Sequence, residues 1–210
     1  MMVSFEEKVR RQYERAASAY DKRWKGYIFS SLSVLKERMQ VTGGEKILDV
    51  ACGTGALEEL IVKEHPSQSM TGVDMAENML NVAKRKLAAC PSVSFFQSGA
   101  THLPFADDAF DLVVCANSFH YFDDPGASLC EMRRVLRKGG RLVILDWCRD
   151  YLVCQLCDLF LKVFDPAHRY CYRQGELAGF LIDAGLQLLT GHKFKLNLVW
   201  GMMIAEAVKV

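Results

Sequence analysis

The sequence predicts an α/β fold with a mainly parallel sheet and helices on both of its faces. Short apolar segments alternate with amphipathic ones across residues 46–147, which is the pattern of strands joined by crossover helices. The apolar segments lack polar alternation, as expected for strands that are covered on both sides. Half of the 210 residues are hydrophobic, which is enough to bury the core of one domain. We therefore expect a single domain over residues 1–210, with a seven-stranded sheet and one antiparallel edge strand.

The first 44 residues are predicted to be helical. Apolar and aromatic residues recur every three or four positions from Phe5 to Trp24, which indicates an amphipathic helix. A second helix is expected over 28–40, ending before Gly43 and Gly44.

The middle of the chain supplies five strands and three helices. Strands are predicted over 46–51, 69–74, 93–98, 110–117 and 140–147, and helices over 56–65, 76–89 and 125–138. The helix over 125–138 is expected to end at Gly139 and Gly140, which form a favourable C-cap pair. In such a sheet, ligands bind beyond the carboxyl ends of the strands, near the point where strand order reverses.

The last third is less regular. A helix is predicted over 173–185, followed by strands over 186–191 and 198–210 that would form an antiparallel pair at the edge of the sheet. A helix over 151–163 would place Cys154 and Cys157 on one face.

Composition bears on the partners of the protein and on its cellular compartment. The formal net charge of +1 argues against a nucleic-acid partner. No apolar run reaches the roughly 18 residues that a membrane span requires, and the N-terminus has no apolar leader. Eight cysteines without an export signal indicate reduced thiols, so we expect a cytoplasmic protein.

A glycine turn is the main candidate for ligand binding. Gly53 and Gly55 follow a strand and open a helix, whose free N–H groups favour an anionic group. Asp74 ends the following strand, where its carboxylate can accept both ribose hydroxyls of an adenosine.

Three ligands compete for this turn. A P-loop is excluded because the Lys and Ser/Thr of its motif are missing. A dinucleotide fingerprint would need glycine where Glu58 stands. S-adenosylmethionine (SAM) carries a carboxylate and an ammonium, and Asp49 supplies a negative field for the ammonium, directly or through water.

Five blocks occur in the order and at the spacing of a known family. The sequence resembles the class I SAM-dependent methyltransferases, in particular the methyltransferase-11 or UbiE-like group, over about residues 45–146. The blocks are ILDVACGTG (47–55), GVDMAENML (72–80), SGATHLPFADDAFDLVV (98–114), NSFHYFDDP (117–125) and EMRRVLRKGGRLVILD (131–146). The resemblance implies a Rossmann-like methyltransferase fold and methyl transfer from SAM to a small-molecule acceptor, on oxygen or carbon. It indicates no oligomeric state.

The resemblance also implies the cofactor site. Asp74 would bind the ribose, Met75 would line the adenine, and Asn117 and Tyr20 would contact the methionine moiety. Local alternatives are a helix N-cap for Asp74, a core position for Tyr20 and a turn residue for Asn117. The expected cofactor-binding residues are Tyr20, Asp49, Ala51, Gly53, Gly55, Asp74, Met75, Met79, Gly99, Ala100, Thr101 and Asn117.

One position departs from the family pattern. An acid that contacts the adenine amine usually precedes the alanine of the third block, and this chain has Gly99 there. We expect the backbone of Ala100 and Thr101 and apolar packing to hold the adenine instead. The expected cost is small, because one exposed hydrogen bond contributes only about 0.5–1.5 kcal/mol.

Methyl transfer needs alignment, exclusion of water and, for some acceptors, a base. His120 follows the fourth strand and is the candidate catalytic base. Residues 1–44 would form a helical lid, 45–146 the cofactor-binding core, 147–172 a lid insertion and 173–210 a closing helix and strand pair.

Four cysteines in the last third allow an alternative function. Cys148, Cys154, Cys157 and Cys171 suggest an arsenite or metalloid methyltransferase, because thiolates bind thiophilic centres. Their spacing matches no zinc-ribbon pattern and their segment is apolar, so packing is favoured and no metal site is expected. A SAM- or nucleotide-binding regulatory module without catalysis is the remaining alternative.

Overall fold

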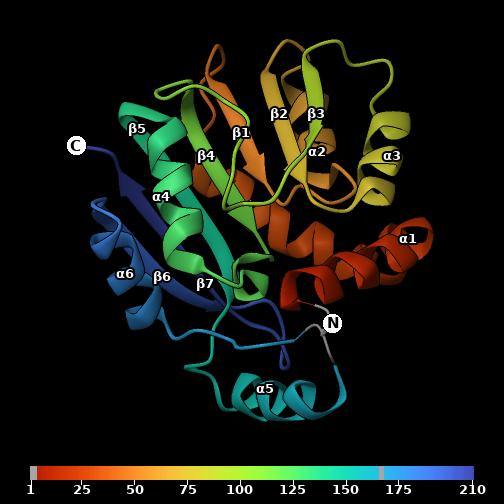
Figure 1. Ribbon diagram of the computed structural model, residues 1–210, viewed down its shortest axis with the longest axis vertical. Helices are drawn as coiled ribbons and strands as arrows, with labels where there is room; N and C mark the ends of the chain where they lie inside the picture. Colours follow the sequence, from red (N-terminus) through yellow and green to blue (C-terminus); the bar gives the residue numbers. More distant parts are fainter. Residues whose placement is uncertain (1–3, 166–167) are drawn as a thin grey trace.

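A seven-stranded sheet forms the centre of the computed structural model, which describes residues 4–165 and 168–210 (Figure 1). The strand order is β3-β2-β1-β4-β5-β7-β6. The strands are β1 (Lys46–Val50), β2 (Ser69–Asp74), β3 (Val93–Gln97), β4 (Phe110–Ala116), β5 (Leu136–Trp147), β6 (Gln187–Lys195) and β7 (Gly201–Val208). The two predicted lid segments include residues 1–3 and 166–167, which lie outside the described residues.

The predicted fold class is confirmed. Strands β3, β2, β1, β4 and β5 pair in parallel, and β7 pairs antiparallel with both β5 and β6. The antiparallel strand is therefore next to last, and β6 forms the edge. Strand order reverses between β1 and β4, so the crevice expected for a ligand lies between their carboxyl ends.

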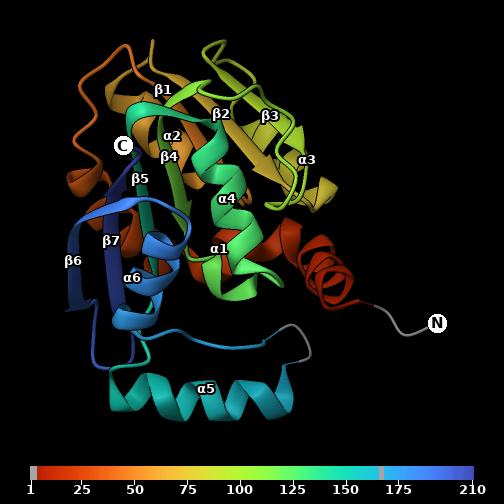
Figure 2. The same ribbon diagram turned by 60° about the vertical axis from the view of Figure 1, so that its left-hand side comes forward.

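Helices cover both faces of the sheet (Figure 2). One core layer contains Leu129 of α4 and Leu177 of α6, and the other contains Leu35 of α1 and Ile61 of α2; all four side chains are fully buried. The helices are α1 (Phe5–Met39), α2 (Ala56–Glu64), α3 (Glu77–Lys86), α4 (Pro125–Val135), α5 (Leu152–Phe164) and α6 (Gln174–Asp183), with a 3-10 turn at Phe119–Tyr121.

The N-terminal segment forms one helix, and the prediction of two helices was wrong. Helix α1 runs for 35 residues and passes through Gly26 without interruption. Glycine costs about 1 kcal/mol in a helix interior. Burial of Leu32, Leu35 and Met39 against the sheet offsets that cost.

The expected end of the helix over 125–138 was also wrong. Helix α4 ends at Val135, and β5 already begins at Leu136. The end of the chain competes for this segment, because the Lys209 ammonium donates to the Leu136 carbonyl at 2.7 Å and Gly139 N–H donates to the Lys209 carbonyl at 2.8 Å. No helix among the described residues is long and apolar enough to span a membrane.

Candidate functional site

A pocket opens beyond the carboxyl ends of β1, β2 and β4, with α1 across it. Its empty volume, which includes the open solvent at its mouth, is about 930 Å³. Both faces of its lining are partly aromatic, with Tyr13 and Tyr20 from α1 and Tyr121 and Phe122 from the segment after β4. The pocket therefore combines the end of the parallel sheet with an N-terminal cover.

The glycine turn serves two structural purposes. Gly53 and Gly55 have φ angles of 56° and 72°, in the left-handed region that glycine adopts readily. A Cβ on Gly55 would lie 3.0 Å from Ala83 Cβ and 3.2 Å from the Phe95 ring, so this glycine permits helix-strand packing. A Cβ on Gly53 would meet nothing within 4 Å, because this residue faces the pocket.

Helix α2 begins directly after this turn. Its N-cap, Gly55, provides no side-chain hydrogen bond to the first turn. The first N–H groups of the helix therefore remain available to an anionic group in the pocket.

Asp74 connects the turn to the end of β2. Its carboxylate accepts hydrogen bonds from Gly53 N–H at 2.9 Å and Ala76 N–H at 2.8 Å. Burial raises the pKa of Asp74 to about 6, although these N–H groups oppose the shift. Each carboxylate oxygen has a second acceptor site, so Asp74 can bind two ligand hydroxyls while it orders the turn.

Two further acids lie buried beneath the turn. Asp49 Oδ1 and both carboxylate oxygens of Glu58 have no hydrogen-bond partner among the described residues. Burial raises the pKa of Glu58 to about 7 and that of Asp49 well above its usual value, with the Glu58 charge as a second cause for Asp49. Asp49 lines the pocket, so an ammonium group there would gain a partner and compensate the buried carboxylate.

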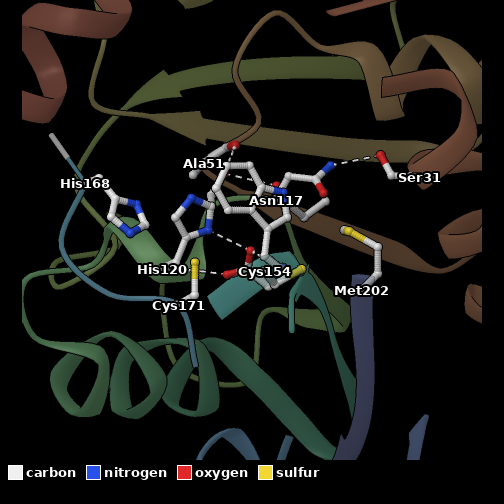
Figure 3. Close-up of polar contacts among 12 residues, drawn as sticks. Ser31, Ala51, Asn117, His120, Cys154, His168, Cys171 and Met202 are labelled. Atoms are coloured by element: carbon white, nitrogen blue, oxygen red, sulfur yellow. Dashed lines mark hydrogen bonds and ion pairs between the residues drawn. The ribbon is translucent and has the colours of Figure 1, made fainter. Parts of the chain in front are cut away.

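Asn117 occupies a constrained position at the end of β4 (Figure 3). Its φ is 57°, and its N–H donates to the Leu145 carbonyl at 2.7 Å. Its side-chain oxygen accepts from Tyr27 Oη at 2.7 Å, and its Nδ2 donates to Ser31 Oγ at 3.1 Å. Trp147 Nε1 donates to the same Tyr27 Oη at 2.6 Å. The local sequence gives no signal for Tyr27 or Ser31, because their contacts link α1 to residues about 90 positions away.

Glu6 approaches the position where the family acid is missing. A Cβ on Gly99 would lie 2.9 Å from Glu6 Oε1, the one neighbour within 4 Å. A carboxylate is thus present beside Gly99, and it comes from the first turn of α1. The local sequence around Gly99 gave no signal of this substitute.

Helix α1 is attached to the core by polar contacts around the pocket. The Glu14 carboxylate accepts from Glu77 N–H at 2.7 Å and from Asn78 N–H at 2.9 Å, so it caps α3. Asp21 accepts from Thr54 Oγ1 at 2.5 Å and pairs with the Lys86 ammonium at 2.6 Å. Burial raises the pKa of Tyr20 to about 12, so its phenol is a hydrogen-bond donor at neutral pH.

His120 lies behind the pocket and not on its surface. Its Nδ1 is 2.6 Å from Asp146 Oδ1, and its N–H donates to Asp146 Oδ2 at 2.8 Å. The ring stacks on Trp147 with centroids 4.6 Å apart, and the Tyr121 ring, which lines the pocket, is 4.0 Å away. His120 Nε2 is buried without a partner among the described residues (Figure 3).

The structure gathers most of the predicted site residues around this pocket. Those that line it are Tyr20, Asp49, Ala51, Gly53, Asp74, Met75, Met79, Gly99, Ala100 and Asn117. Gly55, Thr101 and His120 lie outside the lining. Gly55 acts through helix packing and His120 borders the pocket through Tyr121, whereas Thr101 is exposed.

The four C-terminal cysteines form no thiolate cluster. Within the described ranges, one group of three or more candidate metal ligands occurs, and it contains Asp158, His168 and Cys171, with ligand atoms within 4.8 Å of one another. Asp158 already accepts from Lys162, from His168 Nε2 at 2.8 Å and from Cys171 N–H. Cys148 and Cys154 are buried. The metalloid alternative therefore lacks structural support.

Comparisons with known proteins agree with this geometry. A family model described as "Methyltransferase domain" matches residues 48–144. Demethylmenaquinone methyltransferase of Staphylococcus aureus (strain JH9) is 36% identical over 167 residues, covering 76% of this chain and 69% of that protein.

Solved structures give the same fold. A SAM-dependent methyltransferase from Thermotoga maritima (TM1293) has a TM-score of 0.77 at 20% identity, covering 96% of this chain and 100% of that one. One from Aquifex aeolicus has a TM-score of 0.68 at 22% identity, covering 85% of this chain and 89% of that one. With its family blocks, its relative and its fold in agreement, the chain belongs to the class I SAM-dependent methyltransferases, in the methyltransferase-11 or UbiE-like group.

Proposed function

We propose that this methyltransferase acts on an aromatic, hydroxyl-bearing small molecule of the quinone-precursor type, with His120 as the base. The observation that carries the proposal is the buried His120–Asp146 pair beside an aromatic pocket. Demethylmenaquinone methyltransferase, the relative at 36% identity, has a name that points to the same acceptor class.

The pocket fits SAM by the chemistry of its donors and acceptors. When bound, SAM supplies a methyl group activated by a sulfonium. Asp74 would accept the ribose hydroxyls, and the first turn of α2 would face the carboxylate of the methionine moiety. The unpartnered Asp49 oxygen would face the ammonium, directly or through water. Asn117, Tyr20 and Met75 would complete the contacts, as proposed from the sequence.

His120 has the environment of an oriented base. With Nδ1–H donating a hydrogen bond to the Asp146 carboxylate, the lone pair of the imidazole lies on Nε2. That nitrogen is buried without a partner, so it could take a proton from an acceptor hydroxyl that reaches it. Entry of the acceptor requires movement of Tyr121 or of the segments that cover His120, because His120 is outside the present lining.

The base assignment is tested by replacing His120 with glutamine. Release of S-adenosylhomocysteine is measured with a panel of phenols, hydroquinones and carboxylates as acceptors. We expect kcat of His120→Gln to fall by about 10²–10⁴-fold, with SAM affinity unchanged. His192→Gln, at an exposed position on β6, is the matched control. Unchanged kcat in His120→Gln across pH would exclude the base role, and turnover with carboxylate acceptors alone would exclude the acceptor class.

The cofactor assignment is tested separately at Asp74. Asp74→Asn retains the shape of the side chain and loses the charge, so SAM should bind roughly tenfold more weakly by calorimetry at pH 7.5. The ionised carboxylate is the better acceptor, so wild-type affinity should increase as pH rises through about 6 and the variant should lack this dependence. Asp124→Asn, which alters the N-cap of α4, is the control. Equal affinities would reject Asp74 as the ribose ligand.

A further inference from the structure

Helix α5 presents an apolar face to solvent. Six large side chains of this helix are 60–76% exposed, and we name them the apolar ridge: Leu152, Leu156, Leu159, Phe160, Val163 and Phe164. The opposite face is directed toward the protein and contains the buried Cys154 and Asp158. Surface helices normally place polar residues outward, so the ridge is a face that lacks a partner within the described part of the chain.

Polar contacts hold α5 in this orientation. Asp158 accepts from His168 Nε2 at 2.8 Å and from Cys171 N–H at 2.9 Å. Near the other end of the helix, Cys154 Sγ lies 3.4 Å from the Gly201 carbonyl. A rotation that buried the ridge against the protein would break these contacts. The outward ridge is therefore a feature of the folded chain.

The spacing of the ridge is that of a seam between two helices. Leu152, Leu156, Leu159 and Val163 follow one another at intervals of four, three and four residues. These are the a and d positions of helices that pack along their length, where each side chain fits between those of the facing helix. The two phenylalanines of the ridge widen the same stripe. The pattern therefore favours a helix as the partner.

The area of the ridge is that of a protein contact. At these exposures, six side chains of this size present on the order of 700 Å², close to the roughly 800 Å² that each partner contributes to a standard interface. The turn between β6 and β7 adds Leu198, which is 88% exposed, and its neighbour Val199 accepts from Cys154 Sγ. Figures 1 and 2 both show α5 across one end of the molecule, where a second molecule can approach it.

The N-terminal end of α5 carries a positive group. The Lys195 ammonium lies 5.5 Å from the ring of Tyr151, which is the N-cap of the helix. The acid beside it, Asp150, is paired with the Lys193 ammonium at 3.0 Å. This end of the ridge is therefore bordered by one neutral ion pair and one further cation.

The C-terminal end of α5 has the opposite charge. Lys162 is paired with Asp158 at 2.8 Å, and Asp165 follows the last residue of the helix as its C-cap. When two such helices pack antiparallel, the N-terminal end of each lies beside the C-terminal end of the other. Lys195 of each copy then lies on the side of Asp165 of the other copy, twice by symmetry.

We propose that two copies of this chain associate through α5, with the two apolar ridges packed antiparallel about a two-fold axis. A pair of such faces offers on the order of 1,400 Å², within the roughly 1,200–2,000 Å² of specific, stable interfaces. The contact is the same from both sides, so each ridge covers the other. Because α5 also positions Asp158 against His168, association holds in place a segment that packs beside His120.

Sedimentation velocity of the whole chain over a series of concentrations tests this inference. We expect a reversible dimer, and at least tenfold weaker association for Leu156→Ser/Leu159→Ser/Phe160→Ser. The matched control is Phe29→Ser/Ile182→Ser/Leu189→Ser, which removes three exposed apolar side chains elsewhere and should dimerise like the wild type. A cooperative thermal unfolding transition in both triple variants verifies that they are folded.

A charge exchange tests the antiparallel orientation. Lys195→Glu and Asp165→Lys should each weaken the dimer by about 2–10-fold, because each places two pairs of like charges across the interface. The double variant Lys195→Glu/Asp165→Lys should regain most of the wild-type affinity. Only a contact between two copies in this orientation predicts that recovery.

Three results overturn the inference. The first is a wild type that sediments as a monomer throughout, whether or not its ridge then binds a lipid vesicle or a different protein. The second is a ridge variant that dimerises as strongly as the control. The third is a double charge variant that associates no better than the single ones.

Discussion

Ala51 and Asn117 adopt positive φ angles of 65° and 57° at the ends of β1 and β4. Non-glycine residues in this region cost on the order of 1–3 kcal/mol, and such strain concentrates at functional sites. Asn117 is kept there by Tyr27, Ser31 and the Leu145 carbonyl. Its side chain is therefore positioned by α1 and β5 together, which explains how an ordinary turn residue can become part of the pocket.

Glu6 and Gly99 provide a test at the residue scale. If Glu6 replaces the acid that the family has at position 99, Glu6→Ala should weaken SAM binding by about 2–10-fold, the worth of one exposed hydrogen bond. Gly99→Asp in the Glu6→Ala background should restore the affinity, because Glu6 is the one group that a Cβ there would meet.

Calorimetry with SAM measures all three variants of this test. Glu37→Ala, an exposed glutamate near the other end of α1, controls for the loss of charge on this helix. Wild-type affinity in Glu6→Ala would show that Glu6 contributes nothing, and would favour the expectation from the sequence that backbone groups and apolar packing hold the adenine.

Helix α1 is the element that both closes the pocket and completes another helix. The N-cap of α3, Ala76, has no side-chain hydrogen bond to offer, and Glu14 of α1 accepts from Glu77 and Asn78 N–H in its place. A carboxylate at a helix N-terminus also interacts favourably with the helix dipole. Opening of α1 would therefore expose the pocket and uncap α3 in the same motion.

Removal of the Glu14 carboxylate should weaken this attachment. Glu14→Ala loses two charge-assisted hydrogen bonds at a partly exposed site, so we expect the free energy of unfolding to fall by about 1–2 kcal/mol. For a chain of this length, that corresponds to a Tm lower by roughly 3–6 °C. Hydrogen exchange should show faster opening of α1 and of the first turn of α3.

Glu7→Ala is the control for the attachment of α1. Glu7 pairs with Arg10 and Arg11, both within the same helix. Its loss should leave exchange at the first turn of α3 unchanged. Equal protection of α3 in Glu14→Ala and the wild type would mean that the cap contributes nothing.

Strands and helices of the central core could be predicted because their signals are local. The KILDVA segment and the glycines that follow it contain the information for a buried strand and a tight turn. The continuity of α1 through Gly26 depends on burial of its C-terminal half against the sheet. The early end of α4 depends on contacts with Lys209. Neither set of contacts lies within a local stretch of sequence. The same limit applies to the site. Glu6 lies beside Gly99, Tyr27 bonds to Asn117 and Trp147 bonds to Tyr27, and in each case the two residues are far apart in the sequence.

At the scale of the whole molecule, three acids meet beneath the glycine turn, where the strand order reverses. Burial raises the pKa of all three carboxyl groups. The pKa of Asp49 lies well above its usual value, that of Glu58 is about 7 and that of Asp74 is about 6. The folded chain therefore retains protons that the unfolded chain loses near pH 4–4.5. Such a cluster costs stability at neutral pH, and a ligand cation beside Asp49 would recover part of it.

The raised pKa of Glu58 allows the stability cost of this acid cluster to be measured by global unfolding. Because its pKa is about 7 in the folded chain and 4.5 in the unfolded chain, its contribution to stability is present below pH 4.5 and is lost as pH rises to 7. The loss amounts to about 3 kcal/mol at most. Burial lowers the pKa of His168, which acts in the opposite direction below its usual value of 6.5, so the Glu58 contribution must be isolated as a difference between two proteins.

Urea unfolding of the wild type and Glu58→Gln between pH 5 and 7.5 provides that difference. Glutamine cannot ionise, so the variant should be the less stable protein at pH 5, where it leaves a buried amide unsatisfied, and should gain on the wild type by about 2–3 kcal/mol toward pH 7.5. Glu59→Gln changes the next residue on α2, a half-buried glutamate that pairs with Lys63, and should follow the wild-type curve. Parallel curves for Glu58→Gln and the wild type would mean that Glu58 is already ionised in the folded enzyme near pH 5. Solvent would then have to stabilise the buried Glu58 carboxylate.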